Sequence, residues 1–83
     1  MREISINLDC GQFTKEMRDA IGYLSMWAFD MYDKVVIYRD HGNDEGGDKY
    51  PDLIAYYQNT TTWSKYVIGA VWNESTQQYS FHS

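Results

Sequence analysis

The side chains best suited to chemistry are concentrated in one short segment, residues 40–48, which reads Asp-His-Gly-Asn-Asp-Glu-Gly-Gly-Asp. Carboxylate and amide oxygens are the ligands that calcium prefers. An EF-hand loop beginning at Asp40 would need an acid or Asn at its third position, glycine at its sixth and glutamate at its twelfth. Those positions hold Gly42, Glu45 and Pro51. We therefore predict no dedicated calcium site, with an irregular oxygen-ligand site as the alternative.

Other catalytic or metal-binding patterns are weak. Structural zinc usually needs closely spaced pairs of Cys or His, and Cys10, His41 and His82 are isolated in the sequence. A nucleophile such as Cys10 would have to meet His41 through the fold. Asp40, His41 and Asp44 could form an acid–base cluster, but no basic surface for gripping a substrate accompanies them. We predict no catalytic residue, metal or cofactor, and keep a small enzyme or ligand-binding domain using Asp40 and His41 as the alternative.

Negative charge is concentrated in the middle of the chain. Seven of the twelve carboxylates lie between residues 30 and 52: Asp30, Asp33, Asp40, Asp44, Glu45, Asp48 and Asp52. Three basic residues oppose them there, so this part carries a net −4 of the total −5. Such a charge disfavours direct binding to nucleic acid and to anionic membranes, because both repel it. It favours a partner with a basic surface.

The length and composition predict one domain, residues 1–83, with an unusual aromatic content. Three Trp, eight Tyr and three Phe can anchor a core in a chain this short, because each buries a large area. Cys10 has no partner for an intramolecular disulfide, the first residues lack an apolar signal core, and the uncharged run 53–64 is too short and polar to span a bilayer. We expect an intracellular, cytoplasmic protein, in the host cytoplasm if it is viral.

The apolar spacing predicts one helix after a first strand. Residues 4–8 alternate between apolar and polar, as a half-buried strand does. Asp9 and Gln12 have capping-box spacing and predict a helix start close to them. An apolar stripe at three- and four-residue steps follows. Its members are Phe13, Met17, Ala20, Ile21, Leu24, Trp27, Ala28 and Met31.

Four further strands are predicted, with short connections after the first one. They cover residues 34–38, 53–57, 66–72 and 77–82, and glycine, proline and acidic residues fill the long connection 39–51. The fold class is therefore α+β: one amphipathic helix packed on a mainly antiparallel sheet of four to five strands, in the order β-α-β-β-β-β. The expected core residues are Ile6, Met17, Ile21, Leu24, Ile37 and Ile68.

One helix cannot cover both faces of such a sheet. Adjacent strand residues such as Tyr56 and Tyr57 point to opposite faces, so at most one of them lies under the helix. Several aromatic side chains should therefore be at least partly exposed, among Tyr38, Tyr50, Tyr56, Tyr57, Trp63 and Tyr79. An exposed aromatic face beside an acidic rim has the composition of a protein–protein interface.

These patterns predict a small acidic protein-binding module without catalysis of its own. Its expected partner is a protein with a basic surface. In the more specific form of this hypothesis, that surface also binds nucleic acid. By size and charge it is comparable to inhibitors that viruses or mobile elements encode against host defence. The expected contact residues are Asp40, Asp44, Glu45, Asp48, Asp52, Tyr50, Tyr57 and Trp63. A homo-oligomeric structural protein, such as a homodimer, is a further alternative.

Overall fold

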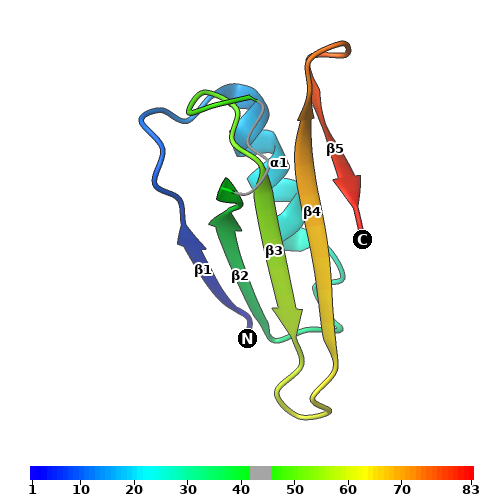
Figure 1. Cartoon of the computed structure of the whole chain (residues 1–83). Helices are drawn as coiled ribbons and strands as arrows, with labels where there is room; N and C mark the ends of the chain where they lie inside the picture. Colours follow the sequence, from blue (N-terminus) through cyan, green and yellow to red (C-terminus); the bar gives the residue numbers. More distant parts are fainter. Residues whose placement is uncertain (42–45) are drawn as a thin grey trace.

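The computed structural model describes residues 1–41 and 46–83, and within them it contains one helix and five strands (Figure 1). The elements are β1 (Glu3–Asn7), α1 (Lys15–Met26), β2 (Lys34–Arg39), β3 (Leu53–Gln58), β4 (Lys65–Asn73) and β5 (Gln78–His82). The strands form a single sheet in the order β1-β2-β3-β4-β5. The predicted α+β class and element order are confirmed.

The sheet is antiparallel except at one edge. Strands β2 to β5 form a meander in which each strand pairs antiparallel with the next. Strand β1 pairs parallel with β2, and α1 makes the crossover between these two strands. A parallel pair needs such a crossover because its strands begin at the same end of the sheet. The helix lies against one face of the sheet, so the fold has two layers (Figure 1).

Helix α1 is shorter than its apolar stripe predicts. Its N-cap is Thr14, whose Oγ1 accepts a hydrogen bond from the Met17 amide at 3.2 Å, so the predicted start near Asp9 is wrong. The predicted continuation to Met31 is also wrong. The backbone becomes extended at Trp27, and the residue after it has a positive φ of 46°.

The carbonyls at the end of α1 are bound by a side chain from β1's N-terminal flank. Arg2 donates to the carbonyl oxygens of Trp27 at 3.1 Å and Ala28 at 3.0 Å, and also to that of Ser25. Its Nε donates to the Tyr32 carbonyl at 3.1 Å. The last turn of the helix has no basic residue of its own. Arg2 therefore supplies the positive charge that a helix C-terminus favours.

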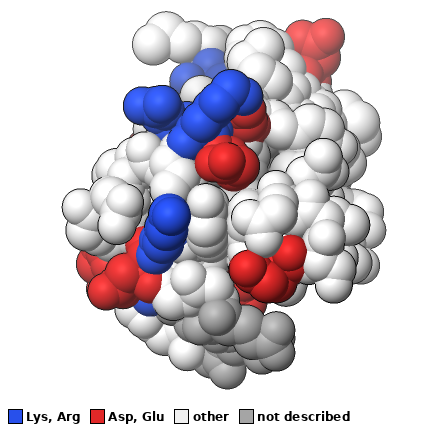
Figure 2. Space-filling model, turned by 90° about the horizontal axis from the view of Figure 1, so that it is seen from above, with Lys and Arg blue, Asp and Glu red and all other residues white. Residues whose placement is uncertain are grey.

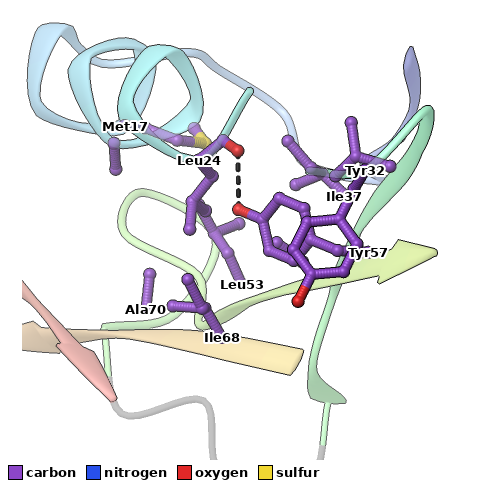
Figure 3. Close-up of a cluster of buried hydrophobic side chains, with 11 residues drawn as sticks. Met17, Leu24, Tyr32, Ile37, Leu53, Tyr57, Ile68 and Ala70 are labelled. Atoms are coloured by element: carbon purple, nitrogen blue, oxygen red, sulfur yellow. Dashed lines mark hydrogen bonds between the residues drawn. The ribbon is translucent and has the colours of Figure 1, made fainter. Parts of the chain in front are cut away.

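The core lies between α1 and the sheet (Figure 3). Alternate residues of the three central strands face the helix and are buried: Val35, Ile37, Leu53, Ala55, Tyr57, Ile68, Ala70 and Trp72. Four predicted core residues, Met17, Leu24, Ile37 and Ile68, are confirmed as buried. Ile21 is partly buried against this cluster.

Ile6 is a wrong core prediction, because its side chain is 46% exposed. It pairs with Ile37 and faces the helix side, as its alternation predicts. However, β1 is an edge strand, and the closest backbone approaches of α1 are to β2 and β5. Correct orientation is therefore not sufficient for burial at this edge.

Tyr57 joins the two layers through its hydroxyl. The ring is fully buried, and its Oη donates to the Leu24 carbonyl at 2.6 Å, the contact drawn as a dashed line in Figure 3. This bond satisfies one of the four carbonyls that the end of a helix leaves without an intrahelical donor. Burial raises the pKa of Tyr57 to about 12.

Replacing Leu24 by Ala tests the core. Leu24 is fully buried, so we expect Leu24→Ala to lower the free energy of unfolding by about 2–5 kcal/mol. Met26→Ala is the matched control, because Met26 is on the same helix but 64% exposed, and its loss should be small. Urea unfolding followed by circular dichroism measures both. Equal losses in the two variants would contradict this account of the core.

The buried phenol predicts a stability loss at high pH. The folded protein holds the Tyr57 proton to a pKa of about 12, whereas the unfolded chain releases it near 10. Stability from this group is therefore complete below pH 10 and is lost as the pH rises through 12. At pH 8, Tyr57→Phe should cost about 1 kcal/mol through the lost hydrogen bond. Unfolding measured from pH 8 to 12 should show the two stability curves converging and then crossing, because the rise in pKa from 10.0 to about 12 outweighs a loss of about 1 kcal/mol. Parallel curves would refute the assignment.

Candidate protein-binding surface

We call residues 40–48 the acidic segment, and its described residues, 40–41 and 46–48, lie at one end of the sheet (Figure 1). It connects β2 to β3, at the end where α1 begins and where β4 turns into β5 (Figure 1). Asp40 extends the pairing of β2 and β3 by one step, since its amide donates to the Asp52 carbonyl at 2.8 Å. The predicted contact residues Asp44 and Glu45 lie outside the described residues.

Charges at this end are partly paired. Arg39 Nη1 lies 2.8 Å from Asp48 Oδ1 and 3.0 Å from the Asp9 carbonyl oxygen, and its side chain is only 8% exposed. His41 Nε2 lies 3.2 Å from Asp9 Oδ2, an ion pair whenever the imidazole is protonated. Viewed from this end, acidic and basic side chains are interspersed (Figure 2). The described part of this end is therefore a mixed surface, not a uniformly negative patch.

The described residues considered for metal binding form no cluster, and Asp44, the third member of the candidate acid–base cluster, lies outside the described residues. Cys10 lies next to the core, with its Sγ 4.0 Å from Met17 Sδ, while His41 pairs with Asp9. Among residues 1–41 and 46–83, no three His, Cys, Asp or Glu side chains are grouped so that they could hold a metal ion.

Tyr50 is half-buried in an aromatic cluster beside the acidic segment. Its ring stacks on Trp72 with centroids 3.7 Å apart and planes within 2° of parallel. Trp72 Nε1 donates to Glu74 Oε2 at 2.7 Å, and this bond, with one from Gln77, lowers the pKa of Glu74. The ammonium of Lys49 lies over the Tyr50 ring, 5.5 Å from the ring centroid.

Two predicted contact residues are wrong because they are buried. Asp52 is 2% exposed and Tyr57 is fully buried. The strand register explains Tyr57: it lies between Val35 and Tyr66, on the face of the sheet that the helix covers. Parity along β3 requires one of its two adjacent tyrosines to face the helix, and Tyr57 is that one.

Trp63 is exposed but belongs to a different part of the surface. Its side chain is 71% exposed and lies in the connection between β3 and β4. That connection is at the opposite end of the sheet from the acidic segment (Figure 1). The longest dimension of the molecule is 39 Å, so Trp63 and Asp48 do not form one compact patch. The expected partial exposure of several aromatic side chains is confirmed by Trp63 and by Tyr38, which is 39% exposed.

Between these two ends lies the face of the sheet that the helix leaves uncovered. Two cross-strand rows on this face are largely apolar: Val36, Tyr56 and Val67 form one, and Tyr38, Ile54 and Gly69 form the other. Tyr38 and Val67 are exposed, and the other four are half-buried. Val71 continues the apolar surface along β4. We call these seven residues the open face.

Polar residues border the open face. Lys34, Gln58 and Lys65 form the next row toward Trp63, and Asp40 follows Tyr38 at the other end. Sequence alternation already separates Val67, Gly69 and Val71 from the buried side of β4. None of the open-face residues is among the predicted contact residues. Alternation shows that two groups of residues point to opposite faces, but it does not show which group the helix leaves uncovered.

Comparison with known proteins adds no assignment, since no family model, curated protein or solved structure matches this chain. Within the described residues, no helix is long and apolar enough to cross a membrane.

Because residues 40–48 lack the ligand positions of an EF-hand loop, we predict that calcium does not change the thermal stability of the protein. A ligand that binds the folded state at 100 times its dissociation constant adds about 2.7 kcal/mol of stability. We therefore expect the same melting temperature, by scanning calorimetry, in millimolar calcium and in chelator. A rise of many degrees in calcium alone would reveal a site that includes residues 40–48.

Proposed function

We propose that this protein is a small binding module that attaches to a larger protein and inhibits it by occupying a basic surface. The observation that carries the proposal is the open face, where aliphatic and aromatic side chains of three adjacent strands are left without a covering layer. Contiguous exposed apolar surface rimmed by polar groups is typical of interaction sites. Tyr38 and Tyr56 are suited to such a role, because tyrosine is enriched among the residues that dominate interface energetics.

The charge of the surface supports a basic partner. The chain carries net −5, and two of its seven basic residues have internal roles. Arg2 donates to four backbone carbonyls, and the side chain of Arg39 is nearly buried. Exposed carboxylates such as Glu3, Asp9 and Asp48 are distributed over the surface. They would speed association with a positively charged protein and slow association with a negative one.

Inhibition is the proposed consequence of that binding. Basic surfaces inside cells most often serve nucleic acid, so a bound acidic module would compete with DNA or RNA. This module would gain affinity from the open face and orientation from charge. Its small size and acidity are those of inhibitors that viruses or mobile elements direct against host defence.

The test separates the contribution of the open face from that of the acidic residues. The partner is first identified by affinity capture and mass spectrometry and is then purified. The open-face variant carries Tyr38→Thr and Val67→Thr, because threonine is polar and has a high preference for strands. The charge variant carries Asp40→Asn, Asp44→Asn, Glu45→Gln and Asp48→Asn. Met26→Ala is the control for loss of an exposed apolar side chain on the opposite layer.

We expect the open-face variant to bind at least tenfold more weakly at both low and high salt. The charge variant should associate more slowly at low salt, and this difference should shrink as salt screens the charges. Surface plasmon resonance measures both rates. An open-face variant that binds like the Met26→Ala control would overturn the proposed surface. A partner that binds nucleic acid equally well with and without the module would overturn the inhibitory role.

A further inference from the structure

Strand β5 is an edge strand with little protection against pairing. It pairs with β4 on one side and has no strand on the other within the described residues. An antiparallel edge leaves every second residue with an unpaired amide and carbonyl pointing outward. Natural edges are often blocked by Lys, Pro or an inward-pointing charge. The sequence of β5, Gln-Tyr-Ser-Phe-His, contains no Lys, Pro, Asp or Glu, whereas the other edge strand, β1, carries Glu3.

A groove runs between this edge and the helix. Its volume is about 390 Å³, and its walls include Lys15, Asp19, Ala20 and Tyr23 of α1 with Tyr79 and Phe81 of β5. Phe81 packs on Tyr23 with ring centroids 4.4 Å apart and is still 38% exposed. A strand added to β5 would therefore find backbone partners at the edge and, on the helix side of the sheet, the apolar side chains of Ala20, Tyr23 and Phe81 in the groove.

We propose that the occupant of this edge is β5 of a second copy of the chain, paired antiparallel about Ser80. In that register Ser80 lies opposite Ser80, Gln78 opposite His82, and Tyr79 opposite Phe81. Tyr79 and Phe81 pair with Trp72 and Ala70 within the chain, which places them on the helix side. Each copy would thus insert an aromatic side chain beside Tyr79 in the groove of the other copy.

The charge distribution favours a second copy at this seam despite the net −5. The five pairing positions carry no carboxylate, and His82 lies opposite a neutral Gln78. On the helix wall of the groove, Lys15 and Asp19 form an ion pair at 2.7 Å, and Glu16 adds one further carboxylate. The paired strands themselves would therefore bring no like charges opposite each other. The pairing would join two five-stranded sheets into one and place the two open faces side by side.

Dimerisation goes beyond the proposed function and is testable without any partner. Sedimentation equilibrium of the wild-type chain should give twice the 9.8 kDa chain mass, falling toward one chain on dilution. Ser80→Lys and Ser80→Glu should each give the mass of one chain, because the two-fold axis places like charges opposite each other. An equimolar mixture of the two variants should recover the double mass, because opposite charges then pair.

Two controls keep the result specific. Ser5→Lys puts the same charge on the uncovered side of the other edge strand and should leave the dimer intact. Ser80→Thr should also remain dimeric, and circular dichroism should show that every variant is folded. Wild-type protein with single-chain mass at hundreds of micromolar would overturn the proposal. A dimer lost in Ser5→Lys but kept in Ser80→Lys would also overturn it, as would single-chain mass for the mixed variants. None of these results would bear on binding through the open face.

Discussion

The structure depends on the constraint that one helix of twelve residues must cover one face of a five-stranded sheet. Such a helix is about 18 Å long and about 10 Å wide, whereas neighbouring strands are about 4.8 Å apart. Its backbone approaches β2 and β5 most closely, and it leaves part of that face, including the edge at Ile6, without direct cover. Aromatic side chains add cover elsewhere: Trp27 packs on Tyr57 and Tyr66, and Tyr23 packs on Phe81. These aromatic contacts thus extend the cover that a short helix gives to a wide sheet.

The position of that helix is fixed at its C-terminal end by side chains from distant parts of the sequence. Arg2 and Tyr57 donate to carbonyls of the last helical turn and of the bend that follows it. These bonds satisfy backbone acceptors that would otherwise be buried without donors, and they join β1 and β3 to the helix. Local sequence contains no signal for them, because the last turn lacks a basic residue. This is why the apolar stripe predicts a helix that continues to Met31 whereas the structure ends it at Met26.

The parts of the fold that follow from the alternation of apolar and polar residues could be predicted. Those that depend on where the helix lies across the sheet could not. The alternation in β4 correctly separates Ile68 and Ala70 from Val67 and Gly69. Alternation also places Ile6 on the helix side, but its exposure depends on which strands the helix crosses. The same distinction applies to Tyr57, where the adjacent tyrosines are opposed by geometry and only the packed structure identifies the buried one. Asp52 is buried although its charge favours exposure and the sequence pattern predicts it as a partner contact.

Charge and apolar surface have different physical roles in the proposed binding, and the structure separates them in space. Arg39 draws Asp48 into a pair at one end of the sheet, so this carboxylate cannot offer its full charge to a partner. Long-range attraction depends on net charge and survives such local pairing, whereas short-range affinity depends on desolvated contact. In the proposed binding the open face would provide the contact, because Tyr56 and Val67 lie side by side on adjacent strands and no described element covers them. A basic partner would therefore be attracted by the whole molecule but held by the face that its single helix leaves uncovered.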